Sequence, residues 1–378
     1  MPGQRTDSAV LTDSPGRCQP HAVQPARRAP GSSIVAAILL LAIAHATASS
    51  AELAGAGKLL EGVHGIAAPG VPGPLCVFGP RSSVVAVGKM GPDVMQPVLA
   101  AAELGRGRVV AFGHTGYLDP PAFAVADTAR LMANVLHWTA GTTAEERPRV
   151  AVHGRPGLLP WLKERGFHAA ALDGDQWIAR LKYAQVVCLC PADLRPAEVE
   201  ALSEYVRQGG GLIAADLGWG WLQLHPGKSL LTDHPGNRLL ASVGIVWADG
   251  YLQRTSGDGF TTDAAPSGLS HAGQALAALA RLADLAKPKP DTASKPEPEL
   301  AQASATALLA ARSLPSDDTL LRPRLEAMCR RQADNAIPCP ERPIKAADAL
   351  ARLTITLEHE AMSRLPPQQV QAIPAAKV

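Results

Sequence analysis

The chain has 378 residues, of which 47% are hydrophobic and 19% are charged, and its formal net charge is +2. Such a composition indicates a globular protein with a sizeable core. A net charge so close to zero, with scattered arginines, provides no basic field, so we expect no nucleic-acid partner.

The first 48 residues are predicted to be a secretion signal with an unusually long polar leader. Two arginines precede an apolar run over residues 34–44, and a small-x-small pattern of the kind that signal peptidase reads ends at Ala48. The run is shorter than the roughly 20 residues needed to span a bilayer. We therefore expect cleavage near Ala48, export to the periplasm or the medium, and no stable membrane span afterwards. The alternative is an uncleaved membrane anchor.

Residues 49–286 alternate between apolar runs and amphipathic segments, which is typical of an α/β domain. Fully apolar strands and glycine-capped helices predict a mostly parallel sheet with helices on both faces. Residues 96–104 are expected to form a short helix or amphipathic turn, and the glycine-rich stretches before residues 108 and 212 to be helix-to-strand turns. Strands are expected over residues 75–79 and 84–88 (as a hairpin or neighbours), 108–114, 149–154, 168–172, 185–190 and 212–216, and helices over 123–138, 158–165 and from 196 to the glycines at 209–211.

The composition changes near residue 264, within the last part of this domain. A helix is expected after Ser267, and residues 287–299 are charged and rich in proline, which predicts a linker that cannot pack. Residues 300–378 are predicted to be a small helical segment, with helices near 300–312, 320–332 and 350–365.

The cysteines divide into two kinds. Cys329 and Cys339 flank a short loop and are predicted to form a disulfide in an oxidising compartment. Cys188 and Cys190 are two residues apart in an apolar strand, so both point to the same face, and we expect them to be buried structural thiols.

The known catalytic motifs are not found. His359 and Glu360 resemble the start of the zinc motif H-E-x-x-H, but Ser363 stands where the second histidine is needed. No nucleophile elbow is present, because Cys190 precedes Pro191 and lacks flanking glycines. We therefore predict no catalytic, cofactor or metal-binding residues. The alternative is a hydrolase that uses Cys190 or a pair formed by His114 and Asp119.

Two segments at the expected carboxyl ends of strands are candidates for ligand contacts, because open α/β sheets bind ligands there. The tryptophans are suited to stacking on a sugar ring, and the alternative is that they and His114 are ordinary packing and capping residues. The candidate contacts are His114, Tyr117 and Asp119 after the first strand, and Asp216, Trp219 and Trp221 after the second.

The order of four segments resembles the N-terminal region of enhancin-type, mucin-targeting gluzincin metallopeptidases and the related TRP-channel-associated factors. The segments are AAAELGRGRVVAFGHTGYL, MANVLHWTAG, LSEYVRQGGGLIAADLGWGW and HPGNRLLASVGIVWADG. The resemblance, over roughly residues 61–378, implies a class I glutamine-amidotransferase-like (flavodoxin-like) domain without its nucleophile, and a helical segment leading toward a catalytic half that this sequence lacks. It thus implies a non-catalytic accessory, binding or scaffold region, with a glycan, glycoprotein or protein partner. A structural envelope protein is a further alternative.

Overall fold

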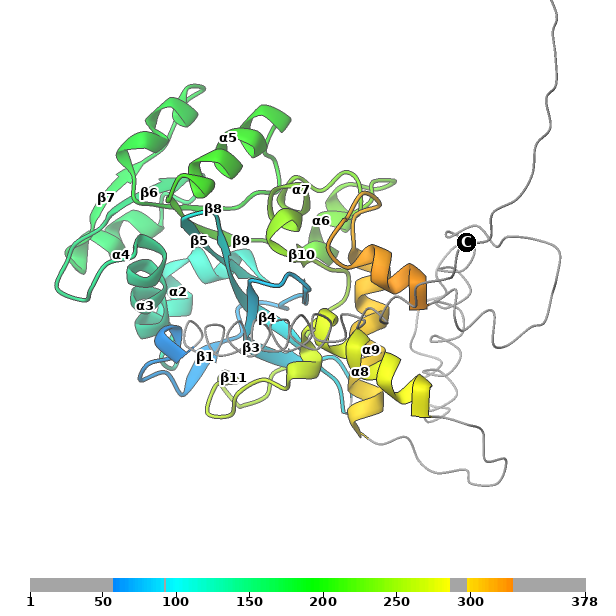
Figure 1. The fold of residues 1–378 in the computed structure, drawn as a ribbon. Coiled ribbons are helices and arrows are strands. Elements are labelled where there is room, and N and C mark those ends of the chain that lie inside the picture. Colours follow the sequence, from blue (N-terminus) through cyan, green and yellow to red (C-terminus); the bar gives the residue numbers. More distant parts are fainter. Residues whose placement is uncertain (1–56, 92, 286–297, 329–378) are drawn as a thin grey trace, which may run out of the picture. The chain divides into compact units, whose positions relative to one another are not determined.

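A seven-stranded sheet forms the centre of the computed structural model, which describes residues 57–91, 93–285 and 298–328 (Figure 1). Its strand order is β3-β4-β5-β9-β8-β6-β7. The strands are β3 (Ser82–Lys89), β4 (Met95–Leu104), β5 (Gly107–Phe112), β6 (Arg149–His153), β7 (His168–Ala171), β8 (Val186–Leu189) and β9 (Gly211–Ala215).

The direction of the strands confirms the expected mostly parallel sheet. The pairs β5–β9, β9–β8, β8–β6 and β6–β7 are parallel, whereas β3–β4 and β4–β5 are antiparallel. The parallel strands therefore share one carboxyl edge, where the loops that follow β5, β9, β8 and β6 meet.

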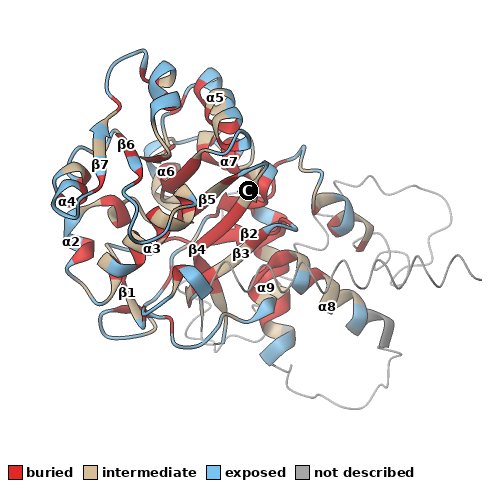
Figure 2. Ribbon diagram, turned by 60° about the vertical axis from the view of Figure 1, so that its left-hand side comes forward, coloured by how far each residue is buried: buried red, intermediate tan, exposed pale blue. Residues whose placement is uncertain are grey.

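Helices cover both faces of the sheet, as the apolar strands require. On β5, Val110 and Phe112 face the core beneath α3 and α4, while Val109 and Ala111 face the core beneath α5 and α7. Figure 2 shows buried strands between helices with exposed outer faces. The helices are α2 (Pro120–Phe123), α3 (Thr128–Ala140), α4 (Leu158–Glu164), α5 (Pro196–Arg207), α6 (Gly218–Leu224) and α7 (Pro235–Leu240), with 3-10 turns η1 (Thr115–Leu118), η2 (Trp177–Tyr183) and η3 (Ala241–Val243).

Two small antiparallel sheets complete the described part of the chain. One pairs β2 (Leu75–Val77) with β10 (Ile245–Trp247), and the other pairs β1 (Gly65–Ala67) with β11 (Gly259–Thr261). The β2–β10 pair packs on the central sheet by one face. Its other face meets the C-terminal helices in a separate apolar cluster. No helix among the described residues is long and apolar enough to cross a membrane.

The prediction of a helix over residues 96–104 is wrong, since this segment is β4. Its run of alanines and leucines has high helix propensity, but pairing with β3 and β5 on both sides overrides that weak preference. The glycine-rich stretch at Gly105 is consequently a turn between two strands, with Gly105 at φ +61°, and not a helix-to-strand turn. The prediction that residues 75–79 and 84–88 form a hairpin is also wrong, because β2 pairs with β10 and not with β3.

Helices follow Ser267 and the predicted linker. Ser267 caps the short turn η4 (Gly268–Ser270), α8 runs over Ala272–Leu285, and α9 runs over Pro298–Ser313, beginning two residues inside that linker. Residues 322–328 are also helical. The predicted signal, most of the linker, the helix over 350–365 and the Cys329–Cys339 disulfide lie outside the described residues, so all four remain predictions.

One side chain of α9 completes the backbone hydrogen bonding at the start of β4. The side-chain amide of Gln302 donates to the Met95 carbonyl at 2.8 Å and accepts from the Met95 N–H at 2.8 Å. Beside it, the Gln96 amide donates to the Thr306 hydroxyl at 3.1 Å. α9 is thus joined to the central sheet by specific polar contacts as well as by apolar packing.

Replacing Gln302 with alanine should lower the free energy of unfolding by about 1–3 kcal/mol, because the part-buried N–H and carbonyl of Met95 lose their partner. Urea unfolding of the two proteins measures the difference. Gln176→Ala, at an exposed position, is the matched control and should change stability by less than about 0.5 kcal/mol. Equal effects of the two substitutions would show that the Gln302 contacts contribute nothing.

Candidate functional site

Polar side chains from four adjacent strands meet at the carboxyl edge of the central sheet. The loop after β5 provides His114 and Asp119, and β9 is followed by Asp216. β8 is followed by Cys190, and β6 is followed one residue later by Arg155. The sheet order β5-β9-β8-β6 therefore brings residues far apart in sequence to one place.

His114 is held in one tautomer by the backbone. Its Nδ1 accepts a hydrogen bond from the Gly116 N–H at 2.9 Å, so in the neutral ring the proton is on Nε2. Nε2 lies against Gly70, which has φ +56° and where a Cβ atom would come within 2.7 Å. Burial lowers the pKa of His114, and the nearby Arg155 lowers it further while Asp119 opposes this. The ring is therefore neutral at pH 7.

Arg155 and Asp119 form a loose ion pair across the edge. Arg155 Nη1 lies 3.5 Å from Asp119 Oδ1, and the two side chains are 25% and 45% exposed. Asp119 precedes α2 but makes no side-chain capping bond to it. Both groups therefore retain hydrogen-bonding capacity toward solvent.

The Cys190 thiol is not activated. Burial raises its pKa to about 11, the Asp216 carboxylate raises it as well, and Arg155 only partly opposes them. At pH 7 the thiol is protonated, whereas a catalytic cysteine needs a lowered pKa. Cys188 is buried as expected, while Cys190 is only partly so, and Cys76, Cys188 and Cys190 are all free.

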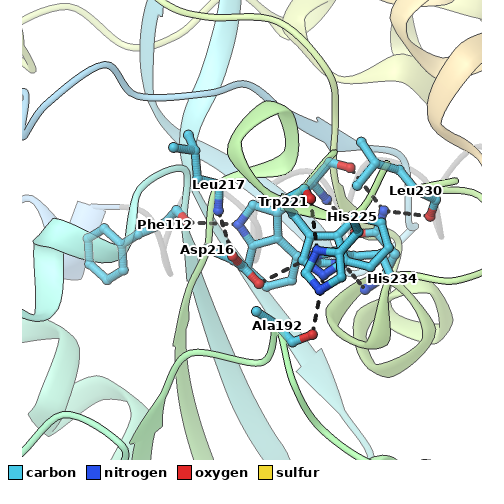
Figure 3. Close-up of polar contacts among 10 residues, drawn as sticks. Phe112, Ala192, Asp216, Leu217, Trp221, His225, Leu230 and His234 are labelled. Atoms are coloured by element: carbon cyan, nitrogen blue, oxygen red, sulfur yellow. Dashed lines mark hydrogen bonds and ion pairs between the residues drawn. The ribbon is translucent and has the colours of Figure 1, made fainter. Parts of the chain in front are cut away.

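Asp216 and His234 form a buried pair behind this edge (Figure 3). Asp216 Oδ2 lies 3.2 Å from His234 Nε2, and the side chains are 4% and 0% exposed. The two atoms are within ion-pair distance but lack hydrogen-bond alignment, and neither has another hydrogen-bond partner in the described structure. His234 Nδ1 accepts from the Asn237 N–H at 3.0 Å, so the neutral ring carries its proton on Nε2, facing the carboxylate.

The pair belongs to a longer network that ends at β5. The Asn237 side chain accepts from the Trp247 N–H at 2.7 Å and donates to the Trp247 carbonyl at 2.9 Å. The Trp247 indole N–H donates to the Phe112 carbonyl at 2.9 Å, and the Asp216 N–H donates to the same carbonyl at 3.2 Å. The last residue of β5 is thereby fixed to α7, β10 and the end of β9.

The two tryptophans of α6 do not lie together. Trp221 is buried, its indole N–H donates to the Ala192 carbonyl at 3.3 Å, and its ring packs on His225 and His234. Trp219 is only partly buried, and its indole N–H donates to the Val71 carbonyl at 3.2 Å. A contact with ligand is thus sterically open to Trp219, whereas Trp221 packs inside.

Tyr117 also packs inside. Its ring stacks on Phe112, its hydroxyl donates to the Ala67 carbonyl at 2.6 Å, and burial raises its pKa. The structure therefore brings His114, Asp119 and Asp216 to one edge and places Tyr117 and Trp221 in the core below it. As ligand contacts, the six residues remain predictions.

Sequence reasoning did not identify Arg155, His234 or Asn237 as parts of this region. Arg155 follows a strand and a glycine, which was a usable signal. His234 stands before Pro235 at the start of a helix, a capping position, but its pairing with Asp216 depends on spatial proximity. No group of three His, Cys, Asp or Glu side chains could hold a metal ion within the described ranges.

Comparison with known proteins connects this fold to one family. The model of the family described as "TRPM8, N-terminal domain" (TCAF_N) matches residues 36–258, which is more than half of the chain. The chain belongs to this family. The suspected relationship to TRP-channel-associated factors is thereby confirmed. The matched range contains all four strands of the carboxyl edge, together with His234, Asn237 and Trp247.

Individual relatives agree with this assignment. TRPM8 channel-associated factor 2 of Bos taurus is 31% identical over 194 residues, which is 50% of this chain and 19% of the relative. TRPM8 channel-associated factor 1 of Homo sapiens is 32% identical over 148 residues, 39% of this chain and 14% of the relative. The chain thus spans a fifth or less of the length of these relatives.

Among solved structures, the chain is similar to the IMPa metallopeptidase of Pseudomonas aeruginosa. In the structure of IMPa with an O-glycopeptide the identity is 12% and the TM-score 0.46, covering 87% of this chain and 36% of that one. For a second IMPa structure the identity is 14% and the TM-score 0.46, and the similarity covers 84% of this chain and 38% of that one.

The raised pKa of Cys190 predicts slow alkylation. At pH 7 roughly one thiol in ten thousand would be ionised, since the pKa is about 11. Iodoacetamide labelling followed by peptide mass spectrometry should show slow modification at pH 7 that accelerates about tenfold per pH unit up to pH 9. The same residue in urea-unfolded protein is the control and should label faster. Faster labelling in the folded protein would indicate an activated nucleophile.

Replacing His234 with alanine should destabilise the fold by at least about 3 kcal/mol, because it removes the cap of α7 and leaves the buried Asp216 carboxylate without its facing N–H. Thermal and urea unfolding measure the loss. His168→Ala, on the exposed strand β7, should change stability by less than about 0.5 kcal/mol. A His234→Ala protein as stable as the control would refute a structural role for the pair.

Proposed function

We propose that the chain is a non-catalytic binding region, which binds a glycan or a glycoprotein partner through the carboxyl edge of its sheet. The observation that carries this proposal is the chemistry of the edge. Arg155 and Asp119 retain hydrogen-bonding capacity toward solvent, and the nearby Cys190 thiol is protonated at pH 7. Trp219, in the helix that follows β9, is partly exposed. Such a combination recognises polar ligands but supplies no nucleophile.

The alternative of a hydrolase is less well supported. A Cys–His enzyme needs a thiolate and a histidine whose ring nitrogen is ready to accept its proton. The Nδ1 atoms of His114 and His234 both accept from backbone N–H groups, so each neutral ring has its proton on Nε2 and neither nitrogen is a free acceptor. Cys190 has a raised pKa. A His114–Asp119 pair also lacks the orienting contact of a catalytic base, because Asp119 lies against Arg155.

We further propose that this region works outside the cytoplasm and as part of a longer protein. Export is supported by the apolar run at residues 34–44 and the small-x-small pattern at Ala48. An accessory role is supported by family membership, since the relatives are several times longer than the matched region. The amidotransferase-like nature of the fold and the kinship with mucin-targeting metallopeptidases belong to the same proposal. Association with the TRPM8 channel appears only in the names of the relatives, and we do not propose it for this chain.

Replacing Trp219 with alanine should weaken binding to an immobilised mucin-type glycoprotein while leaving the melting temperature within a few degrees of wild type, because the ring is partly exposed. Surface plasmon resonance measures the binding. Trp221→Ala should instead lower stability by about 3–5 kcal/mol, because that ring is packed in the core.

Tyr183→Ala is the control for removal of an exposed aromatic ring. Tyr183 is 66% exposed, and its carbonyl accepts from Arg149 at the amino end of β6, away from the carboxyl edge. Its loss should leave binding unchanged. Undiminished binding by a folded Trp219→Ala protein would contradict the proposed site, and release of peptide products from the glycoprotein by wild type would contradict the non-catalytic function.

A further inference from the structure

Three large apolar side chains that are exposed in the described part of the chain come from segments that lie side by side. Val71 is 49% exposed, Met90 36% and Tyr251 64%. The Leu252 N–H donates to the Pro72 carbonyl at 2.7 Å, which joins the segment of Tyr251 to that of Val71. We call these three exposed side chains the apolar surface.

Met90 is attached to the same place by the backbone on its amino side. Lys89 and Gln253 exchange two backbone hydrogen bonds, of 3.0 and 2.8 Å, so Met90 follows a residue that is paired with the segment of Tyr251. The Met90 methyl group lies 2.9 Å from the position that a Cβ atom on Gly250 would take. Backbone hydrogen bonds thus hold the apolar surface together in advance, and exposed apolar groups that gather in this way commonly mark an interaction surface.

An apolar stripe without a described partner is present elsewhere in the same chain. The sequence predicts a helix over residues 350–365, and its apolar residues recur at helical spacing on one face. A single helix of this length is marginal in water, so it is stable only where that face is buried against another apolar group. The face consists of Leu350, Leu353, Leu357, Ala361 and Leu365.

The chain leaves the described domain close to the apolar surface. Met328, the last described residue, packs in the apolar cluster on β2 and β10, and Ala248 belongs to the same cluster. The Ala248 N–H donates to the Pro74 carbonyl at 3.0 Å, on the loop that carries Val71. Residues 329–349 can extend to about 70 Å, which is more than enough for the predicted helix to reach this loop.

We propose that the predicted helix over residues 350–365 packs on the apolar surface of its own molecule. Its leucine face covers Val71, Met90 and Tyr251 and removes them from water. The contact forms within one molecule, because the tether keeps the effective concentration of the helix at the surface high. This inference goes beyond the proposed function and does not rest on it.

Hydrogen exchange of the purified full chain at pH 7, read by mass spectrometry, is the test. Peptides that cover residues 350–365 should exchange at least about tenfold more slowly than the same segment as a free synthetic peptide. Tyr251→Ser should speed this exchange, and Val71→Ser together with Tyr251→Ser should bring it to the rate of the free peptide. Tyr183→Ser is the control, because Tyr183 is 66% exposed and lies outside the apolar surface, and it should leave the protection unchanged.

Substitutions in the segment provide the reciprocal test. Leu353→Glu together with Leu357→Glu should abolish the protection, whereas Arg352→Ala, on the opposite face of the predicted helix, should keep it. All these variants should melt within a few degrees of wild type, since they alter exposed positions of the domain or the segment outside it.

Three results would overturn the inference. Wild-type exchange over residues 350–365 as fast as in the free peptide would show that the segment is not packed. Protection that Val71→Ser with Tyr251→Ser leaves unchanged would place the segment on another surface. Protection that disappears on tenfold dilution would show that a second molecule, and not the tethered segment, covers the apolar surface.

Discussion

The buried contact between Asp216 and His234 is the interaction on which the carboxyl edge depends. A carboxylate taken out of water is costly unless polar hydrogens face it, and here the Leu217 N–H and the His234 Nε2–H do so. The other nitrogen of His234 caps α7, and Asn237 joins this helix to β10. The pair thereby joins the end of β9 to α7, and the hydrogen bonds of Asn237 and Trp247 extend this connection to the last residue of β5. The same contacts occupy Nδ1 of His234, so that this nitrogen is not a free proton acceptor.

Much of the fold could be predicted from the sequence, because apolar runs bounded by glycines specify buried strands. The strands over residues 108–112 and 212–215 and the helix from Pro196 to Arg207 lie where they were expected. β4 could not be predicted in this way. Its alanines and leucines have no period-two alternation, since both faces of the strand are covered. Only its two neighbours in the sheet, one of them β3 at the edge, decide between strand and helix.

The sequence predicted at which edge of the sheet the candidate site lies, but not all of the residues that form it. Position after a strand was enough to select His114, Asp119 and Asp216. The sequence suggested that both tryptophans could contact one ligand. Residues two apart on a helix point about 200° apart, however, so Trp219 and Trp221 cannot face the same ligand. Arg155 and His234 belong to the site because of their contacts with Asp119 and Asp216. Such contacts between distant segments cannot be deduced from residue spacing alone.

The tautomer of His234 is the most direct test of this account. Nitrogen-15 NMR of the folded protein at pH 7 distinguishes a protonated ring nitrogen from an unprotonated one. If the buried pair holds the edge together, His234 carries its proton on Nε2, and Nδ1 has the shift of an unprotonated nitrogen that accepts a hydrogen bond from the Asn237 N–H. A proton on Nδ1 in place of Nε2 would contradict the account, because the histidine could then neither cap α7 nor direct an N–H at the Asp216 carboxylate.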